Sequence, residues 1–409
     1  MDRKTFINSS GRWAILGGLL ANLIQTDFGN VTVKDVRFAA PNGRMYSGLL
    51  YIPDGVTPDA PAPGILAIHG YINTRETQDG FSIEFARRGY VVLALDQSGH
   101  GYSEGPAFAD GFGGIEGMRY LKSLTIVDQN NVGLEGHSMG GWAVVIAAAV
   151  FPDGYKSMVL EGSSTGTYGA PDGTPEFPRN LAVVFSQWDE FAGLMWLTPK
   201  ATDAGKTDKM KAVFNTTEDI EVGKVYGDIA AGTARVLYQP KVVHPGDHIS
   251  QVAIGHAVDW FQKTLVGGNN IPADQQTWYW KEIGTLVAMV GFFIFLVAVG
   301  GLLLTSTGFS SIADPLPAAA SAPSASGGFQ QAHRLPWCIP RIQAVFSACC
   351  TKRRARLSMK DIPWGEILRP VLSWMISPAA SSCWSDFRRI EPLPFRNCVG
   401  LEPRFLPPP

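Results

Sequence analysis

Between residues 30 and 265 the chain alternates short apolar runs rich in β-branched residues with helical patterns. This alternation constrains the fold most, because buried strands joined by helices form a mostly parallel sheet that is covered on both faces. We therefore predict an α/β domain over residues 30–266. Its predicted strands are 31–38, 45–52, 64–68, 90–95, 132–135, 157–160, 181–185 and 236–243. Its predicted helices are 77–88, 115–124, 139–151 and 249–265.

Charge and cysteine content exclude several kinds of partner. The chain has 34 basic and 36 acidic residues, so it lacks the basic field expected of a nucleic-acid-binding protein. All five cysteines lie beyond residue 337 and show no Cys-x-x-Cys spacing, which argues against a disulfide framework or a thiolate metal site. We expect neither a metal nor a cofactor.

An uncharged apolar segment, 283–304, is long enough to cross a bilayer, which takes about 20 residues. Trp278, Tyr279 and Trp280 precede it, as aromatic residues often do at a membrane interface. We predict a transmembrane helix here, preceded by a juxtamembrane linker over residues 267–282.

The N-terminal segment, residues 1–29, contains a shorter apolar core over 13–24, flanked by Arg3, Lys4 and Arg12. This pattern resembles a short anchor or a signal peptide, and the lack of a convincing cleavage site favours retention. If both segments span, basic residues place the N-terminus in the cytoplasm and the α/β domain outside it. The expected location is the cell membrane, with the domain extracytoplasmic.

Two further segments interrupt the regular pattern. Residues 192–234 contain no clean strand and many polar residues, which predicts a small cap inserted over the sheet. Residues 305–409 change composition abruptly, beginning with the low-complexity stretch 318–328. Scattered Trp, Cys, Arg and Pro without periodicity predict a disordered or aberrant tail, for example one produced by a frameshift.

The stretch Gly136-His137-Ser138-Met139-Gly140 stands between a predicted strand and a predicted helix. This is the context of a nucleophile elbow, a turn so tight that the residues two before and two after the serine must be small. We predict that Ser138 is a nucleophile and that the N–H of Met139 stabilises an oxyanion. A Gly-rich structural turn is the alternative.

A second oxyanion donor is expected after an earlier strand. The predicted strand 64–68 ends in His69-Gly70-Tyr71, where the missing side chain of Gly70 lets the backbone approach a substrate. Tyr71 is the candidate donor through its N–H. The alternative is an aromatic residue that merely faces the cap.

The general base must be a histidine on a loop that can reach the serine. The loop between the last strand and last helix contains two, His244 and His248. His248 is preferred because it directly precedes the predicted helix, and His244 remains the alternative. The other histidines fit turns, the elbow, a helix surface or the tail: His69, His100, His137, His256 and His333.

The orienting acid is expected just past a strand end, within reach of the histidine loop. Asp189 follows the predicted strand 181–185 and is preferred, while Glu190 and Glu161 remain alternatives. The resulting order of serine, acid and histidine is the one used by the hydrolase architecture that carries such elbows.

These motifs, together with Asp96-Gln97-Ser98-Gly99-His100-Gly101-Tyr102-Ser103, resemble the α/β-hydrolase superfamily over residues 30–265. Trp280-Lys281-Glu282-Ile283-Gly284 resembles a bacterial membrane-associated branch in which an extracytoplasmic hydrolase domain precedes membrane helices. Relatives of that branch carry a fuller N-terminal anchor and further spans. The resemblance implies an α/β-hydrolase fold and hydrolysis of an ester, thioester or amide, without naming the substrate.

The sequence therefore predicts a membrane-anchored serine hydrolase that acts on a small-molecule acyl substrate. Two alternatives stay open: a non-catalytic accessory module of a membrane assembly, and an acyltransferase that uses the same residues. A probe of serine reactivity separates the first from an enzyme. Product analysis with acceptor alcohols or amines separates the second.

Overall fold

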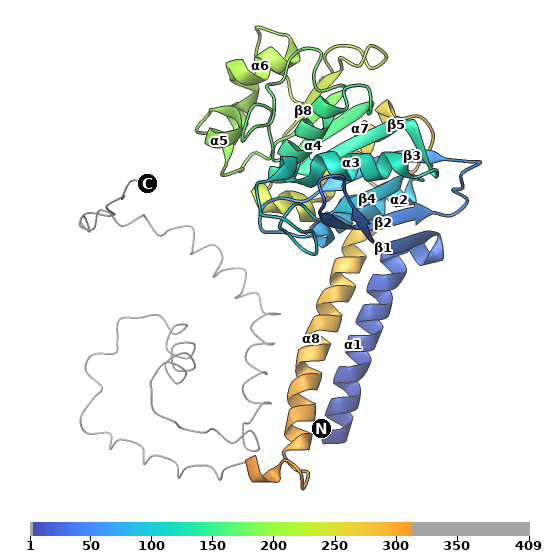
Figure 1. The fold of residues 1–409 in the computed structure, drawn as a ribbon. Coiled ribbons are helices and arrows are strands. Elements are labelled where there is room, and N and C mark those ends of the chain that lie inside the picture. Colours follow the sequence, from blue (N-terminus) through green and yellow to red (C-terminus); the bar gives the residue numbers. More distant parts are fainter. Residues whose placement is uncertain (1–2, 313–409) are drawn as a thin grey trace, which may run out of the picture. The chain divides into compact units, whose positions relative to one another are not determined.

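A computed structural model describes residues 3–312 of the chain (Figure 1). The chain divides into two compact units, 1–295 and 296–409. The helices are α1 (Arg3–Gln25), α2 (Asp79–Arg87), α3 (Gly114–Ser123), α4 (Met139–Val150), α5 (Ala192–Trp196), α6 (Asp208–Phe214), α7 (Gln251–Thr264) and α8 (Trp278–Leu303). The short 3₁₀ helices are η1 (Asp27–Gly29), η2 (Arg75–Gln78), η3 (Asp110–Gly113), η4 (Ala201–Lys206), η5 (His244–Ile249) and η6 (Ser310–Ile312).

The first unit contains an eight-stranded sheet in the order β1-β2-β4-β3-β5-β6-β7-β8. Strands β1 and β2 form an antiparallel pair, β2 is antiparallel to β4, and the remaining neighbours are parallel. The strands are β1 (Val31–Ala39), β2 (Met45–Pro53), β3 (Ala62–Ile68), β4 (Val91–Leu95), β5 (Val127–His137), β6 (Ser157–Glu161), β7 (Leu181–Val184) and β8 (Arg235–Tyr238). The predicted α/β fold is confirmed.

Strand β3 shows why the sheet is buried on both faces. Leu66 and Ile68 pack into one apolar cluster with residues of α3 and α4, while Ile65 and Ala67 pack into a second with residues of α2 and α7. Successive side chains of a strand point to opposite faces, so a continuous apolar run fits only a sheet covered twice. The helices lie on the two sides of the sheet in Figure 1.

The end of the sheet departs from the prediction. The predicted last strand spans residues 236–243. In the structure β8 ends at Tyr238, and the short helix η5 follows from His244. Helix α7 begins at Gln251, so His248 lies inside η5 rather than directly before the helix. Between β7 and β8 the chain forms α5, η4 and α6, in the segment where a cap is predicted.

Helix α8 is long and apolar enough to cross a membrane, with a mean hydropathy of 2.7 over its most apolar window. Among the described residues it alone meets that test of length and composition. It begins five residues earlier than the predicted span, at Trp278, so the aromatic cluster forms its first turn.

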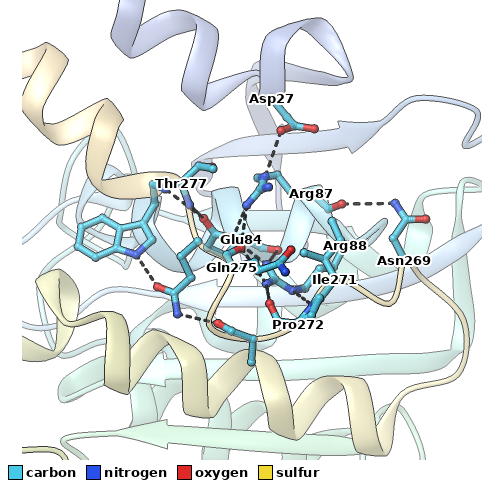
Figure 2. Close-up of polar contacts among 12 residues, drawn as sticks. Asp27, Glu84, Arg87, Arg88, Asn269, Ile271, Pro272, Gln275 and Thr277 are labelled. Carbon is cyan, nitrogen blue, oxygen red and sulfur yellow. Dashed lines mark hydrogen bonds and ion pairs between the residues drawn. The ribbon is translucent and has the colours of Figure 1, made fainter.

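The chain segment before α8 is fixed on helix α2 (Figure 2). The carboxylate of Glu84 accepts the backbone N–H of Thr277 at 2.6 Å and pairs with Arg88 at 2.7 Å. Arg88 also donates to the carbonyls of Ile271 at 3.1 Å and Pro272 at 2.6 Å. Both charged side chains are buried, so this segment is an integral part of the first unit.

The predictions for the tail concern residues that mostly lie outside the described part of the chain. These include the low-complexity stretch 318–328 and the five cysteines. In the second unit the structure describes only the last turns of α8 and the short helix η6.

Candidate active site

Ser138 lies in the sharp turn between β5 and α4, as predicted. Its backbone has φ 54° and ψ −118°, a conformation that costs a non-glycine residue about 1–3 kcal/mol and persists only where neighbours impose it. Two neighbours do so: the Ser138 N–H donates to the carbonyl of Glu161 at 2.8 Å, and the Ser163 hydroxyl donates to the Ser138 carbonyl at 2.6 Å. The strained turn leaves the Ser138 side chain partly exposed.

The glycines around Ser138 are required by close packing. A Cβ added to Gly136 would collide with the backbone of Gly140, and one added to Gly140 would collide with the carbonyl of Ile68. Backbone atoms cannot move aside as a flexible side chain can. The sequence pattern therefore reflects a real steric limit on both sides of the serine.

The turn after β3 lies against the serine. A Cβ at Gly70 would lie 3.2 Å from the Cβ of Ser138, so this position brings the two backbones together. The His69 ring holds the turn, since Nδ1 donates to the Gly70 carbonyl at 2.7 Å and Nε2 accepts the N–H of Gln97 at 3.1 Å. Burial lowers the pKa of His69 to about 4, which keeps this ring neutral and able to accept.

The two predicted oxyanion donors flank this contact. Met139 is the first residue of α4, so its N–H has no carbonyl four residues back in the helix and points toward the helix N-terminus. Tyr71 follows Gly70 and its side chain is 52% exposed, with its ring edge against His100. Their role as donors remains a prediction.

Asp189 contacts His244. Its Oδ2 accepts a hydrogen bond from Nδ1 of His244 at 2.7 Å, and its Oδ1 accepts the backbone N–H of Phe191 at 2.8 Å. Both members of the pair are buried. A carboxylate can only accept, so the proton lies on Nδ1 of His244 and Nε2 carries a free lone pair. This is the tautomer that a general base requires.

Residues 161–162, at the end of β6, contact both Ser138 and His244. Glu161 binds the N–H of Ser138, and a Cβ on the next residue, Gly162, would lie 2.8 Å from Nδ1 of His244. From the other side, Nε2 of His137 donates to the carbonyl of His244 at 3.0 Å. The serine and the Asp189–His244 pair are therefore neighbours.

The expected pair between Asp189 and His248 is not formed. The His248 ring packs against His137, with ring centroids 4.0 Å apart, and against Phe81. Neither of its ring nitrogens has a hydrogen-bond partner among the described residues. Burial lowers the pKa of His248 to about 3, so this ring stays neutral. The early end of β8 explains the difference, because it places His244 rather than His248 beside the acid.

The two alternative acids have other surroundings. Glu190 accepts the backbone N–H of His244 at 2.9 Å, so it binds the main chain of the histidine and not its ring. Neither carboxylate oxygen of Glu161 has a hydrogen-bond partner among the described residues, and burial together with nearby Asp247 raises the pKa of Glu161 well above the usual value. Glu161 therefore makes no hydrogen bond to an imidazole within residues 3–312.

Sequence reasoning missed two contributors to the site. His137 was assigned only to the elbow, and its Nε2 donates to the carbonyl of His244, which holds the main chain of that residue. Asp247 accepts a hydrogen bond from Ser186 and lies 3.8 Å from Nε2 of His137, and burial raises its pKa to about 7. These contacts join residues 61 to 110 positions apart, so no local sequence pattern predicts them. Within residues 3–312, no cluster of three or more potential ligands could hold a metal.

An open hollow of about 500 Å³ lies between the loop after β6 and the predicted cap. Leu194 and Leu197 line it together with Tyr168, whose ring stacks on Trp142 of α4 at 4.7 Å. Lys209 adds one charge and donates to the carbonyl of Met195 at 2.7 Å. The hollow is mixed in polarity, which by itself selects no substrate.

Residues 63–202 match the family model described as the alpha/beta hydrolase fold. The first unit has an α/β-hydrolase fold. A monoacylglycerol lipase of Mycolicibacterium smegmatis (strain ATCC 700084 / mc(2)155) is 31% identical over 126 residues, which are 30% of this chain and 45% of the lipase. An uncharacterised protein of Mycobacterium tuberculosis (strain ATCC 25618 / H37Rv) is 34% identical over 105 residues, which are 24% of this chain and 28% of that protein.

Solved structures similar to the hydrolase domain include a predicted CIB-like hydrolase from Thermoplasma acidophilum. The two proteins are 16% identical in sequence and superimpose with a TM-score of 0.40, over 57% of this chain and 99% of the hydrolase. The Pyrococcus furiosus esterase Pf2001 has 14% identity and a TM-score of 0.41, covering 58% and 95%. The chain spans less than half the length of the two sequence relatives above.

Proposed function

We propose that the chain is a membrane-anchored serine hydrolase that cleaves an ester, thioester or amide through an acyl-enzyme on Ser138. The observation that carries the proposal is the Asp189–His244 pair, 2.7 Å apart, beside a serine held at φ 54°. A fold alone implies no activity, but a strained nucleophile next to an oriented base has little structural purpose. His244 takes the role of base that sequence reasoning gave to His248.

Each residue has one task in the reaction. Nε2 of His244 accepts the hydroxyl proton as Oγ of Ser138 attacks the acyl carbonyl, and Asp189 stabilises the resulting imidazolium. The N–H groups of Met139 and Tyr71 bind the oxyanion. His244 then gives its proton to the leaving group, and water repeats the sequence to release the acid and restore Ser138.

Sequence similarity and helix α8 support this assignment. The family match and the monoacylglycerol lipase relative favour hydrolase activity on an acyl substrate. Helix α8 favours a membrane anchor with the lipid bilayer as partner, and the basic residues near the N-terminus favour the extracytoplasmic side for the domain. Strands and loops of the first unit supply every proposed catalytic group, so the chemistry needs neither cofactor nor metal.

A fluorophosphonate probe tests the proposal. The full chain in detergent is expected to react at Ser138, and Ser138→Ala to lose both labelling and hydrolysis of short p-nitrophenyl esters. Ser123→Ala, at the exposed end of α3, is the matched control and should label normally. Labelling of the Ser138→Ala variant contradicts the proposal. A folded wild-type chain that never reacts favours a non-catalytic accessory domain, and acyl products formed with added alcohols identify an acyltransferase.

A further inference from the structure

Helices α1 and α8 are in backbone contact. A Cβ at Gly17 would lie 2.5 Å from the backbone nitrogen of Ala288, and one at Gly284 would lie 2.8 Å from that of Ala21. The order of these contacts along the two helices shows that they are antiparallel. Such close approach is possible only where side chains are missing, and small residues are the usual means of helix association in membranes.

The contact continues toward the N-terminus of α1. A Cβ at Gly291 would lie 2.7 Å from the backbone nitrogen of Ala14 and 3.1 Å from the carbonyl of Ser10. Ser10 is 4% exposed, and Gly11 faces the ring of Phe295. Helix α8 thus covers the polar residue Ser10 and the small residues Gly11 and Ala14 of α1. When α1 is paired with α8, only the side of α1 that faces away from α8 contacts lipid.

That remaining surface is apolar on both helices. Large hydrophobic side chains that are 43–65% exposed on these two helices include Trp13, Ile15, Leu16, Leu19, Leu23, Ile283, Leu286, Met289, Val290, Phe292 and Phe293. Water does not favour a continuous apolar surface of this kind, whereas a bilayer covers it at no cost. Arg12 is exposed on α1, and its long side chain can extend its charge toward the interface.

A chain of polar contacts joins the domain ends of the two helices. Gln25, the last residue of α1, donates to the hydroxyl of Tyr51 at 3.2 Å, and Tyr51 donates to Asp79 at 2.7 Å. The other oxygen of Asp79 pairs with Lys281 in the first turn of α8 at 2.5 Å. Asp79 is 2% exposed, so it depends on these partners for its charge.

Helix α2 also binds α1 and α8 through a second set of polar contacts. Arg87 pairs with Asp27, just after α1, at 3.0 Å, and with Glu84 at 2.8 Å. Glu84 in turn binds the chain at Thr277, where α8 starts (Figure 2). Two separate networks therefore fix α1 and α8 on the same helix of the hydrolase domain.

We propose that α1 is a permanent second membrane helix that crosses the bilayer as an antiparallel pair with α8, and not a leader that is removed. Removal of α1 would expose Gly284 and Gly291 of α8 and take Gln25 from the Asp79 network. A leader destined for cleavage gains nothing from a complementary surface on a distant helix. The proposal deepens the membrane anchoring proposed above, and its readouts do not depend on catalysis.

Cross-linking tests the pair in membranes. The five native cysteines are first changed to serine, which leaves no other thiol in the chain. Gly11→Cys and Phe295→Cys are then combined, because a Cβ at Gly11 would lie 3.4 Å from the Phe295 side chain, which places the two thiols side by side without a backbone collision. A protease site inserted at exposed Asp59 separates α1 from α8 in the covalent chain.

After oxidation and cleavage, the two fragments are expected to stay joined until a reductant is added. Gly18→Cys with Phe295→Cys is the matched control, because a Cβ at Gly18 would have no neighbour within 4 Å, and its fragments should separate. Mass measurement of the wild-type chain extracted from membranes should find α1 present. A chain that starts after residue 25 overturns the proposal, as does equal cross-linking of the test and control pairs. Loss of probe labelling at Ser138 would leave these results unchanged.

Discussion

The elbow at Ser138 and the loop that carries His244 contribute to one site but are shaped in different ways. The elbow is set by atoms close in the sequence: two glycines allow a turn that no other residue fits. The histidine loop is set by distant residues, since Asp189 binds the ring of His244, Glu190 its N–H and His137 its carbonyl. A locally determined feature can be recognised from a motif, whereas a loop held by long-range contacts cannot.

The strongest test of the elbow is Gly140→Ala. The added methyl group would collide with the carbonyl of Ile68, and we expect a loss of about 3 kcal/mol of stability with no remaining esterase activity. Urea unfolding and ester hydrolysis of the detergent-solubilised chain measure both effects. Gly193→Ala is the control, since its nearest neighbour lies 3.9 Å away. An active Gly140→Ala chain would show that the turn is not sterically limited.

The histidine loop is tested by the same substitution at two positions. His244→Phe removes the proposed base and is expected to lower kcat/KM by about 10²–10⁴-fold. His248→Phe keeps an aromatic ring at a position where the native ring nitrogens have no hydrogen-bond partner in the described part of the chain, so activity should stay within about tenfold of wild type. The kinetics of ester hydrolysis compare the two variants. The reverse ranking would return the base role to His248.

A smaller effect is expected from the contacts that position His244. Glu190→Ala removes the acceptor of the His244 N–H, and one hydrogen bond of about 1 kcal/mol corresponds to a roughly fivefold lower kcat. Glu190→Gln keeps an acceptor oxygen and should restore most of the rate. If the glutamine variant is as slow as the alanine variant, the charge of Glu190 matters rather than its hydrogen bond.

The last effect concerns pH and distinguishes the loop from the elbow, residues 136–140, which contains no acid with a raised pKa. Burial raises the pKa of Asp247 from 3.8 to about 7, so between these values the folded chain holds a proton that the unfolded chain has released. Stability contributed by this proton is complete below about pH 4 and is lost as the pH rises to 7. Asp247→Asn should flatten this fall, by at most about 1.4 kcal/mol per pH unit. Urea unfolding at several pH values measures the slope, and an unchanged slope would assign it to other buried acids such as Glu161.

The predicted fold followed from patterns that local chemistry determines. Apolar runs such as the one ending at Ile68 require burial on both faces, which leads to a covered parallel sheet. Gly136 and Gly140 marked the elbow because their spacing reflects a local steric limit. Asp189, predicted to orient His248, contacts the neighbouring histidine of the same loop, His244, since strand ends at one sheet edge lie close together.

The choice between His244 and His248 was beyond the sequence. Both histidines flank the same Pro-Gly-Asp turn. The apolar pattern of the sequence continues past Tyr238, where β8 ends, so the predicted last strand was too long. Which ring meets Asp189 depends on contacts across more than 50 positions of the chain, and these form only when the sheet is assembled. The pairing of α1 with α8 has the same origin, since their glycines lie more than 260 positions apart.

By itself, then, the sequence determined the α/β fold, the position of Ser138 and the apolar character of α8. These features depend on short-range sterics and on the spacing of apolar side chains, and both are properties of residues close together in the chain. The tertiary structure decided which histidine faces the acid and where α1 packs. Those outcomes depend on which distant surfaces meet, and a contact between distant surfaces has no local signature.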